Sequence, residues 1–482
     1  MHVVVGILFN TFFSLLWSCF FIDPSLIRLP HTKNHAFIRP LGLSICINWL
    51  LFFGPINLFS YFLKTSLQTE YSWVIDRSAF GISMAYSFIA YNVILVMVVI
   101  LNRSLVPFLP IISHAVRGTL PKISVMQTLF LSIFIFLISI FVSPNYGMAS
   151  AAHGAWILNV PLLLRPFAKG LFLMEFIPTV AILINSCDGH RRDNKKLFMY
   201  LVIFVFQFLT FGLLKQRFYS ILVAFALIFM LIRFGLNRIY LALTLMLAPI
   251  SYAVPTALRY GRPEAKCTLR FFDCLKDSWG STLLGLQSKN ILDSLANDLS
   301  YNKSGHASLS VIAGMRDSGL INNTDYLGWV FSDIYRPLPA LIKPMFANFH
   351  SYHSESIVSK VLGIGLPGWQ HSSIHPSLLN GYVADMMETP LMDPVANGGL
   401  NGLMIFSILI PICLVLIWSI FFYFSSKFYY LWFVPYGLLI IIGLNGSWLG
   451  EILVFLKILF PWLIYSYFMF TFPRFVNPNR YI

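Results

Sequence analysis

Residues 402–423 read GLMIFSILIPICLVLIWSIFFY, a stretch of 22 residues that contains no charged side chain. A helix of about 20 apolar residues crosses the roughly 30 Å of hydrocarbon in a bilayer. Inside lipid every backbone polar group needs an internal partner, and a helix supplies one for each of them. The stretch therefore predicts a transmembrane helix.

Similar stretches recur along the chain and indicate its class. Of the 482 residues, 57% are hydrophobic and only 11% are charged, whereas a soluble protein has about 25% charged residues. Such a composition would leave large apolar patches on a water-soluble surface. We therefore expect an all-α polytopic membrane protein, and the composition excludes a disordered chain, a coiled coil and a soluble multidomain enzyme. Eleven spans are predicted, at residues 3–22, 41–63, 80–101, 125–143, 170–187, 197–214, 218–235, 239–258, 402–423, 429–447 and 451–472.

The distribution of basic residues predicts how the spans are oriented. Alternate loops hold fifteen Lys and Arg residues but only three acids, Asp23, Asp188 and Asp193. Cytoplasmic loops carry such an excess of Lys and Arg, so we expect these loops and the C-terminus inside and the N-terminus outside. The net charge of +14 is scattered over short loops. We interpret it as a topology signal and expect no nucleic-acid partner.

One long polar insertion, residues 259–400, separates an N-terminal bundle (1–258) from C-terminal spans (401–482). It holds eleven Lys and Arg residues and twelve of the 19 acids, so it is nearly neutral and typical of a folded periplasmic domain. Apolar spacing predicts amphipathic helices at 279–299 and 326–345, which lie on the membrane or cap the bundle. Prolines should break the second helix. The sequence does not decide whether Cys267 and Cys274 form a disulfide.

The chain lacks the motifs of several enzyme classes. It has no Walker loop, HExxH sequence or nucleophile elbow. It also lacks an Asp-x-Asp pair, which commonly holds a divalent ion on a diphosphate in glycosyltransferases. We therefore expect no cofactor and no metal.

Basic residues also gather at the predicted outer ends of several spans, where the positive-inside rule disfavours them. A guanidinium at the interface can bind phosphate oxygens in a bidentate manner, which indicates an anionic partner. Snorkelling to lipid headgroups or pairing with a loop acid is the alternative for each residue. For Arg217, which follows a very short turn and opens the span 218–235, we favour a functional role. The other residues of this kind are Arg165, Lys169, Lys215, Arg259 and Arg262.

The large insertion offers candidates for proton transfer. Five of the eleven histidines lie in it, and their spacing fits a metal site poorly. A general base for a sugar hydroxyl is a better use of one imidazole or carboxylate. The candidates are Asp333, His353 and His371, although polar loop residues are commonly only solvated.

Three stretches of the chain carry a resemblance to a known family. Residues 217–227, RFYSILVAFAL, open a span with an arginine after a very short turn. Residues 331–344, FSDIYRPLPALIKP, are rich in aromatic residues and proline, and residues 371–381, HSSIHPSLLNG, precede the small residues NGGLNG at 397–402. Over roughly residues 125–425 the chain resembles the Wzy-type polymerases of O-antigen and enterobacterial common antigen repeat units.

The resemblance implies a GT-C-like helical bundle and a metal-independent glycosyltransferase of the bacterial inner membrane. A growing glycan would pass from one undecaprenyl diphosphate carrier to the sugar of another on the periplasmic side. Arg217 would stabilise charge on the leaving diphosphate, and Asp333 or His371 would accept the acceptor's proton. Implied partners are the lipid-linked oligosaccharide, membrane lipid and a chain-length regulator. The implied diphosphate- or glycan-binding residues are Arg165, Lys169, Lys215, Arg259, Arg262, Arg336 and His353.

Two other functions remain open. A flippase or secondary transporter would show short loops, paired halves and charges at mid-membrane, and this chain has few such features. An O-antigen ligase-like or other GT-C enzyme shares the bundle, the donor and the large loop. An acidic pair in the first outer loop would favour the GT-C transferases, but Glu70 and Asp76 are too far apart for a close pair.

Overall fold

The structure is a computed structural model, and all its described secondary structure is helical. Two compact units are present. The first comprises Met1–Arg117, Ser294–Tyr423 and Leu438–Lys457, and the second comprises Gly118–Asp293, Phe424–Gly437 and Ile458–Ile482. The described residues are 2–22, 35–55, 57–58, 77–104, 126, 129–130, 132–134, 136–137, 202–203, 206, 305–322, 324–335, 338, 342–354, 357, 389–427, 434–444, 446, 448–453 and 456.

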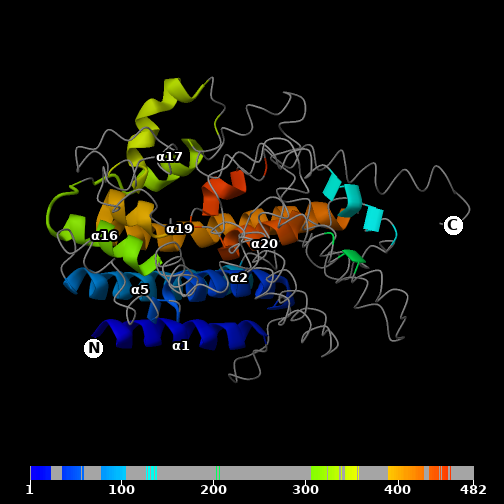
Figure 1. The fold of residues 1–482 in the computed structure, drawn as a ribbon, viewed down its shortest axis with the longest axis horizontal. Coiled ribbons are helices and arrows are strands. Elements are labelled where there is room, and N and C mark those ends of the chain that lie inside the picture. Colours follow the sequence, from blue (N-terminus) through cyan, green and yellow to red (C-terminus); the bar gives the residue numbers. More distant parts are fainter. Residues whose placement is uncertain are drawn as a thin grey trace, which may run out of the picture. The chain divides into compact units, whose positions relative to one another are not determined.

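Three apolar helices form the base of the first unit: α1 (His2–Ile22), α2 (His35–Phe53) and α5 (Arg77–Ser104) (Figure 1). Asn10 of α1 connects them, because its Oδ1 accepts hydrogen bonds from Trp49 Nε1 at 2.7 Å and from Ser87 Oγ at 3.1 Å. The Trp49 and Tyr91 rings stack with centroids 5.3 Å apart. Interhelical bonds of this kind contribute about 0.6 kcal/mol each in lipid.

The contacts also fix the direction of each helix. Asn10 of α1 donates to the Met84 carbonyl of α5. Trp17, further along α1, donates to Asn92, which is further along α5. The two helices therefore run parallel. Asn10 binds Trp49 of α2, whereas Ser14, further along α1, donates to the Cys46 carbonyl, which comes earlier in α2. Helix α2 is therefore antiparallel to α1 and α5. The start of α1, the end of α2 and the start of α5 therefore lie at one end of the bundle.

Two C-terminal helices complete the described bundle: α19 (Met392–Lys427) and α20 (Val434–Leu444). Asn48 of α2 donates to the Ile442 carbonyl of α20 at 2.9 Å and accepts from the Tyr91 hydroxyl at 2.6 Å. Within α19, Gly399 breaks the helical backbone with φ +57° and ψ −141°. Glycine fits this conformation because it has no Cβ.

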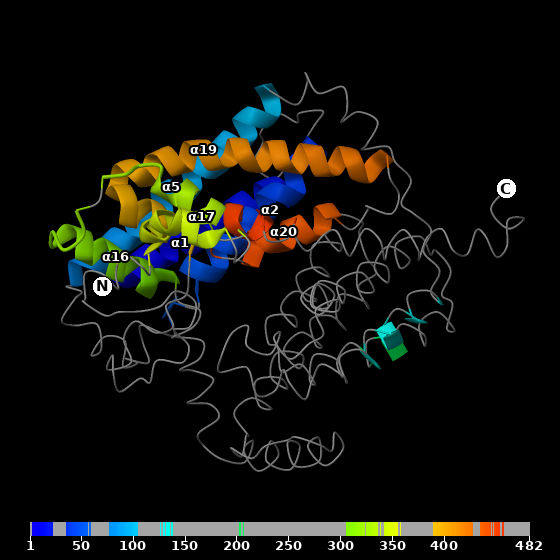
Figure 2. The ribbon, with the colours of Figure 1, turned by 90° about the horizontal axis from the view of Figure 1, so that it is seen from above.

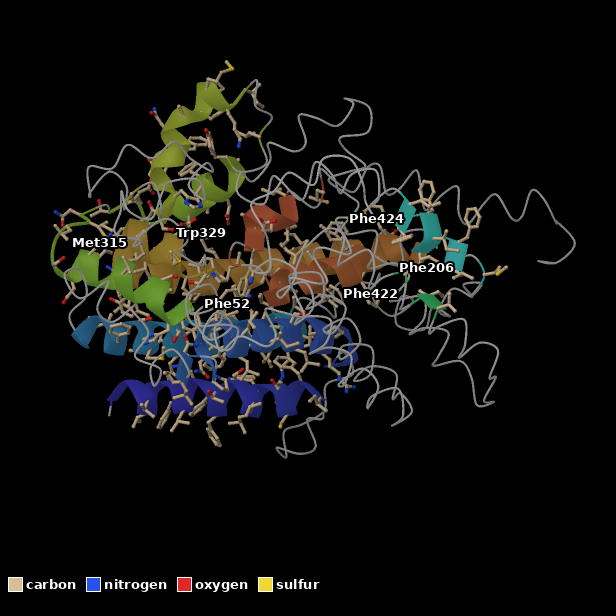
Figure 3. The ribbon with its side chains drawn as sticks, in the orientation of Figure 1. Phe52, Phe206, Met315, Trp329, Phe422 and Phe424 are labelled. Carbon is tan, nitrogen blue, oxygen red and sulfur yellow. The ribbon has the colours of Figure 1, made fainter. Side chains whose placement is uncertain are left out.

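Three elements of the large insertion lie at the end of the bundle where α19 begins: α16 (Gly305–Asp317), α17 (Gly328–Tyr335) and the 3₁₀-helix η4 (Lys343–Tyr352) (Figures 1 and 2). Trp329 of α17 packs edge-on against Phe406 of α19, with ring centroids 4.9 Å apart. Figure 3 shows Trp329 and Met315 at this end of the unit. These elements therefore cap the start of α19.

The helices agree with the predicted class and differ from several predicted bounds. Among the described residues, three helices are long and apolar enough to cross a membrane: Val4–Ile22, Phe80–Ser104 and Met392–Phe424. The shorter apolar helix Ile38–Phe53 is part of α2. The predicted span 429–447 contains α20, whose described helix is Val434–Leu444. The other predicted spans lie wholly or largely outside the described residues, so the number eleven stays a prediction.

Two boundaries have clear physical reasons. Helix α2 ends at Phe53, within the predicted span 41–63, because Gly54 and Pro55 follow it and the Asn57 side chain caps the Phe52 carbonyl at 2.9 Å. Residues 59–63 of that span lie outside the described residues. The predicted amphipathic helix 326–345 is also shorter, since α17 ends at Tyr335 and a separate element begins at Lys343. The predicted helix at 279–299 and the two insertion cysteines, Cys267 and Cys274, lie outside the described residues.

Candidate functional site

Asp393 joins the large insertion to the first turn of α19. Its Oδ2 accepts a hydrogen bond from Ser332 Oγ at 3.1 Å, and its Oδ1 accepts one from the Ser354 backbone N–H at 2.8 Å. A carboxylate in the first turn of a helix is also stabilised by the helix dipole. One side chain therefore fixes both α17 and the end of η4 against the start of α19.

Asn397, one turn further along α19, makes the second connection. Its Nδ2 donates to the Tyr352 carbonyl at 2.6 Å and to the Asp393 carbonyl at 2.8 Å. Gly328 lies so close that a Cβ at this position would be 2.5 Å from Asn397 Oδ1. The start of α17 therefore requires a glycine for the close approach of α19.

Asp333, predicted as a catalytic carboxylate, follows Ser332 in this arrangement. Its side chain is only 7% exposed. The neighbouring Trp329 is also buried, and its Nε1 has no hydrogen-bond partner within the described structure. Asp333 is therefore buried at the end of the bundle, directly after Ser332, which binds Asp393.

Arg316 at the end of α16 approaches the break in α19. Its guanidinium donates to the Ala396 carbonyl at 2.9 Å, and its Nε lies 3.0 Å from the position of a Cβ on Gly399. Partial burial lowers the pKa of Arg316, and the nearby Tyr86 and Tyr326 oppose that shift. Because an arginine keeps its proton in proteins, Arg316 supplies a positive charge beside the break.

Tyr352 and His306 complete the polar groups at this end. The Asp325 carboxylate accepts a hydrogen bond from the Tyr352 hydroxyl, which raises the pKa of Tyr352. Ser83 Oγ donates a hydrogen bond to the His306 carbonyl at 3.2 Å. The same Oγ lies 3.1 Å from His306 Nδ1. Burial lowers the pKa of His306 to about 3, so the imidazole is neutral. Nε2 has no partner among the described atoms.

Two of the predicted site residues belong to this region. Asp333 is buried in α17, and His353 is half-buried directly between Tyr352 and Ser354, which bind Asn397 and Asp393. The structure therefore brings Asp333 and His353 to the same end of the bundle. No group of His, Cys, Asp and Glu suited to a metal is found among the described residues. The other predicted residues, Arg165, Lys169, Lys215, Arg217, Arg259, Arg262, Arg336 and His371, lie outside the described residues.

The sequence pattern did not point to Asp393, Asn397 or Arg316. One signal for Asp393 was available, since an acid followed by proline is typical of a helix start. The segment 397–402 was singled out for its small residues alone, and nothing in the pattern pointed to its asparagine as a bridge. Comparison with protein families, with curated proteins and with solved structures finds no match to this chain.

Proposed function

We propose that the protein is a glycan polymerase of the bacterial inner membrane. It transfers a growing undecaprenyl-diphosphate-linked oligosaccharide onto a new lipid-linked repeat unit on the periplasmic side. The observation that supports this most directly is the position of Asp333, held with His353 at the end of an apolar helical bundle. A lipid-linked substrate presents its sugars and its diphosphate at that level of the membrane.

The proposed chemistry uses one cationic and one basic group. Arg217 binds the departing diphosphate and stabilises the charge that develops on its oxygens. Asp333 or His371 removes the proton from the attacking sugar hydroxyl. Arg165, Lys169, Lys215, Arg259, Arg262, Arg336 and His353 hold the diphosphate and the glycan. The reaction needs no metal, because guanidinium groups supply the positive charge.

Packing at the site is consistent with a rigid support for Asp333. Ser332 on one side of it is hydrogen-bonded to Asp393, and Trp329 is packed against Phe406 of α19. A catalytic group is effective when its neighbours restrict its position. Asp333 must meet the acceptor hydroxyl in the substrate complex, and its burial keeps bulk water away from the carboxylate.

Chain-length ladders of the surface glycan test the proposal. In a strain that lacks the natural protein, the variant Arg217→Ala should give no long glycan chains and leave single capped repeats. Asp333→Asn should do the same, whereas Asp317→Asn, an exposed acid at the end of α16, should give a full ladder. Membrane levels of each variant must match, so that loss of activity is not loss of protein.

The result also separates the alternative functions. Loss of a transporter would remove the single capped repeat as well, because no repeat would reach the outer leaflet. Loss of a ligase would leave long chains that remain on the lipid carrier. Unchanged ladders for Arg217→Ala and for Arg262→Ala would overturn the proposed mechanism.

A further inference from the structure

The 3₁₀-helix η4 presents apolar side chains on its outer side. Met345 is 81% exposed, Phe346 39% and Ile342, directly before the helix, 37%. Ile334 on the neighbouring α17 is 40% exposed. Single exposed apolar residues are common on proteins, but these four lie on or beside two elements that pack against each other, and they are called the apolar edge.

The inner side of η4 is occupied by its own aromatic contacts. Phe331 of α17 packs against Phe349 with ring centroids 5.1 Å apart and against Tyr352 at 5.7 Å. Phe346 also contacts Phe349, with ring centroids 5.4 Å apart, but 39% of Phe346 stays exposed. These contacts hold η4 on α17, while Met345 and Ile342 stay exposed.

The charge of η4 is compatible with a phospholipid surface. Its sequence, KPMFANFHSY, contains one lysine and no acid. Lys343 Nζ lies 5.2 Å from the centroid of the Tyr335 ring. Lysine and tyrosine are the residues that favour a membrane interface, where the ring meets the apolar boundary and the ammonium reaches lipid phosphates.

The hydrogen bonds to α19 define the level of η4 relative to the membrane. Tyr352 ends η4 and is bound to Asn397, two residues before the break at Gly399. Beyond this break, residues 400–424 make a helix of about 38 Å, which suffices to cross about 30 Å of hydrocarbon. The turn before Gly399, and with it the end of η4 that Asn397 binds, therefore belongs to the headgroup region.

We propose that η4 and Ile334 dock on the bilayer surface at the end of the bundle where α19 begins. Ile334, Ile342, Met345 and Phe346 enter the boundary between headgroups and acyl chains, and Lys343 pairs with lipid phosphate. The occupant of the apolar edge is lipid, because the hydrogen bonds to α19 hold this edge at the surface of the bilayer that α19 spans. The inference is independent of the proposed glycan chemistry.

Fluorescence of the full chain in nanodiscs tests this docking. A cysteine-free background carries Met345→Cys or the control Asn322→Cys, an exposed polar position before α17, each labelled with an environment-sensitive dye. The dye at position 345 should emit at shorter wavelength and be quenched several-fold more by nitroxide lipid than the dye at position 322. In discs of anionic lipid, Lys343→Glu should reduce this quenching.

Three results would overturn the proposal. The first is equal quenching by nitroxide lipid at positions 345 and 322. The second is full accessibility of position 345 to a water-soluble quencher in the discs. The third is shielding of position 345 that persists in detergent and depends on protein concentration, which would assign the edge to a second copy of the chain.

Discussion

At the scale of single residues, Asp393 has the strongest predicted effect on the structure. Asp393→Ala removes the acceptor of both Ser332 Oγ and the Ser354 N–H. Leaving a partly buried donor without a partner costs about 1–3 kcal/mol. We therefore expect a lower midpoint of thermal unfolding in detergent and faster proteolysis between α17 and α19. Asp317→Ala, at an exposed acid, should change neither, and equal effects of the two variants would contradict the bridging role.

His306 gives a prediction about pH. Because burial lowers its pKa from 6.5 to about 3, the unfolded chain binds the proton more readily than the folded chain. The contribution of His306 to stability is therefore complete above pH 6.5 and is lost as the pH falls toward 3. Thermal unfolding across this window should show a steeper fall for the natural chain than for His306→Gln. Parallel curves for the two would show that His306 does not control this pH dependence.

The residues of the site differ in how far the sequence could predict them. Asp333 and His353 were predicted from residue type and position, and both lie at the end of the bundle. The role of Asp393 depends on Ser332 and Ser354, which are 61 and 39 positions away in the chain. A pattern of residues along the chain does not contain such long-range contacts, so the bridge could only be found in the structure.

At the scale of elements, uniform apolar runs were predicted well. The spans predicted at 3–22 and 80–101 correspond to α1 and α5 within a few residues. In contrast, α19 begins ten residues before the predicted span 402–423. Its first turns contain Asp393, Asn397 and three glycines, so they show no apolar run. Apart from the break at Gly399, they are helical because contacts with α16, α17 and η4 stabilise them, and tertiary packing of this kind overrides local propensity.

The break at Gly399 is the element whose conformation is most sensitive to substitution. With φ at +57° and ψ at −141°, a Cβ is strained, and it would also lie 3.0 Å from Arg316 Nε. Gly399→Val should destabilise the protein by about 1–3 kcal/mol. The same valine at Gly81, where a Cβ meets nothing within 4 Å, is the control. Comparable unfolding midpoints for the two variants in detergent would contradict a strained break.

At the scale of the whole molecule, the sequence predicted an all-helical membrane protein, and the described residues agree. This property follows from composition, which is independent of tertiary contacts. The orientation of the bundle depends on loop charges that act during insertion, and helix packing alone carries no record of that step. Sidedness is therefore the property that most needs a direct measurement.

Labelling of intact cells with a membrane-impermeant maleimide measures sidedness. In a cysteine-free background, Asn322→Cys lies in the capping region at the start of α19, and Lys427→Cys lies at the other end of that helix. Because Lys427 belongs to the predicted basic cytoplasmic loops, it should react only after permeabilisation, whereas Asn322→Cys should react at once. The opposite result would place Asp333 and His353 in the cytoplasm. A polymerase acting on lipid-linked repeats of the outer leaflet could not then use them.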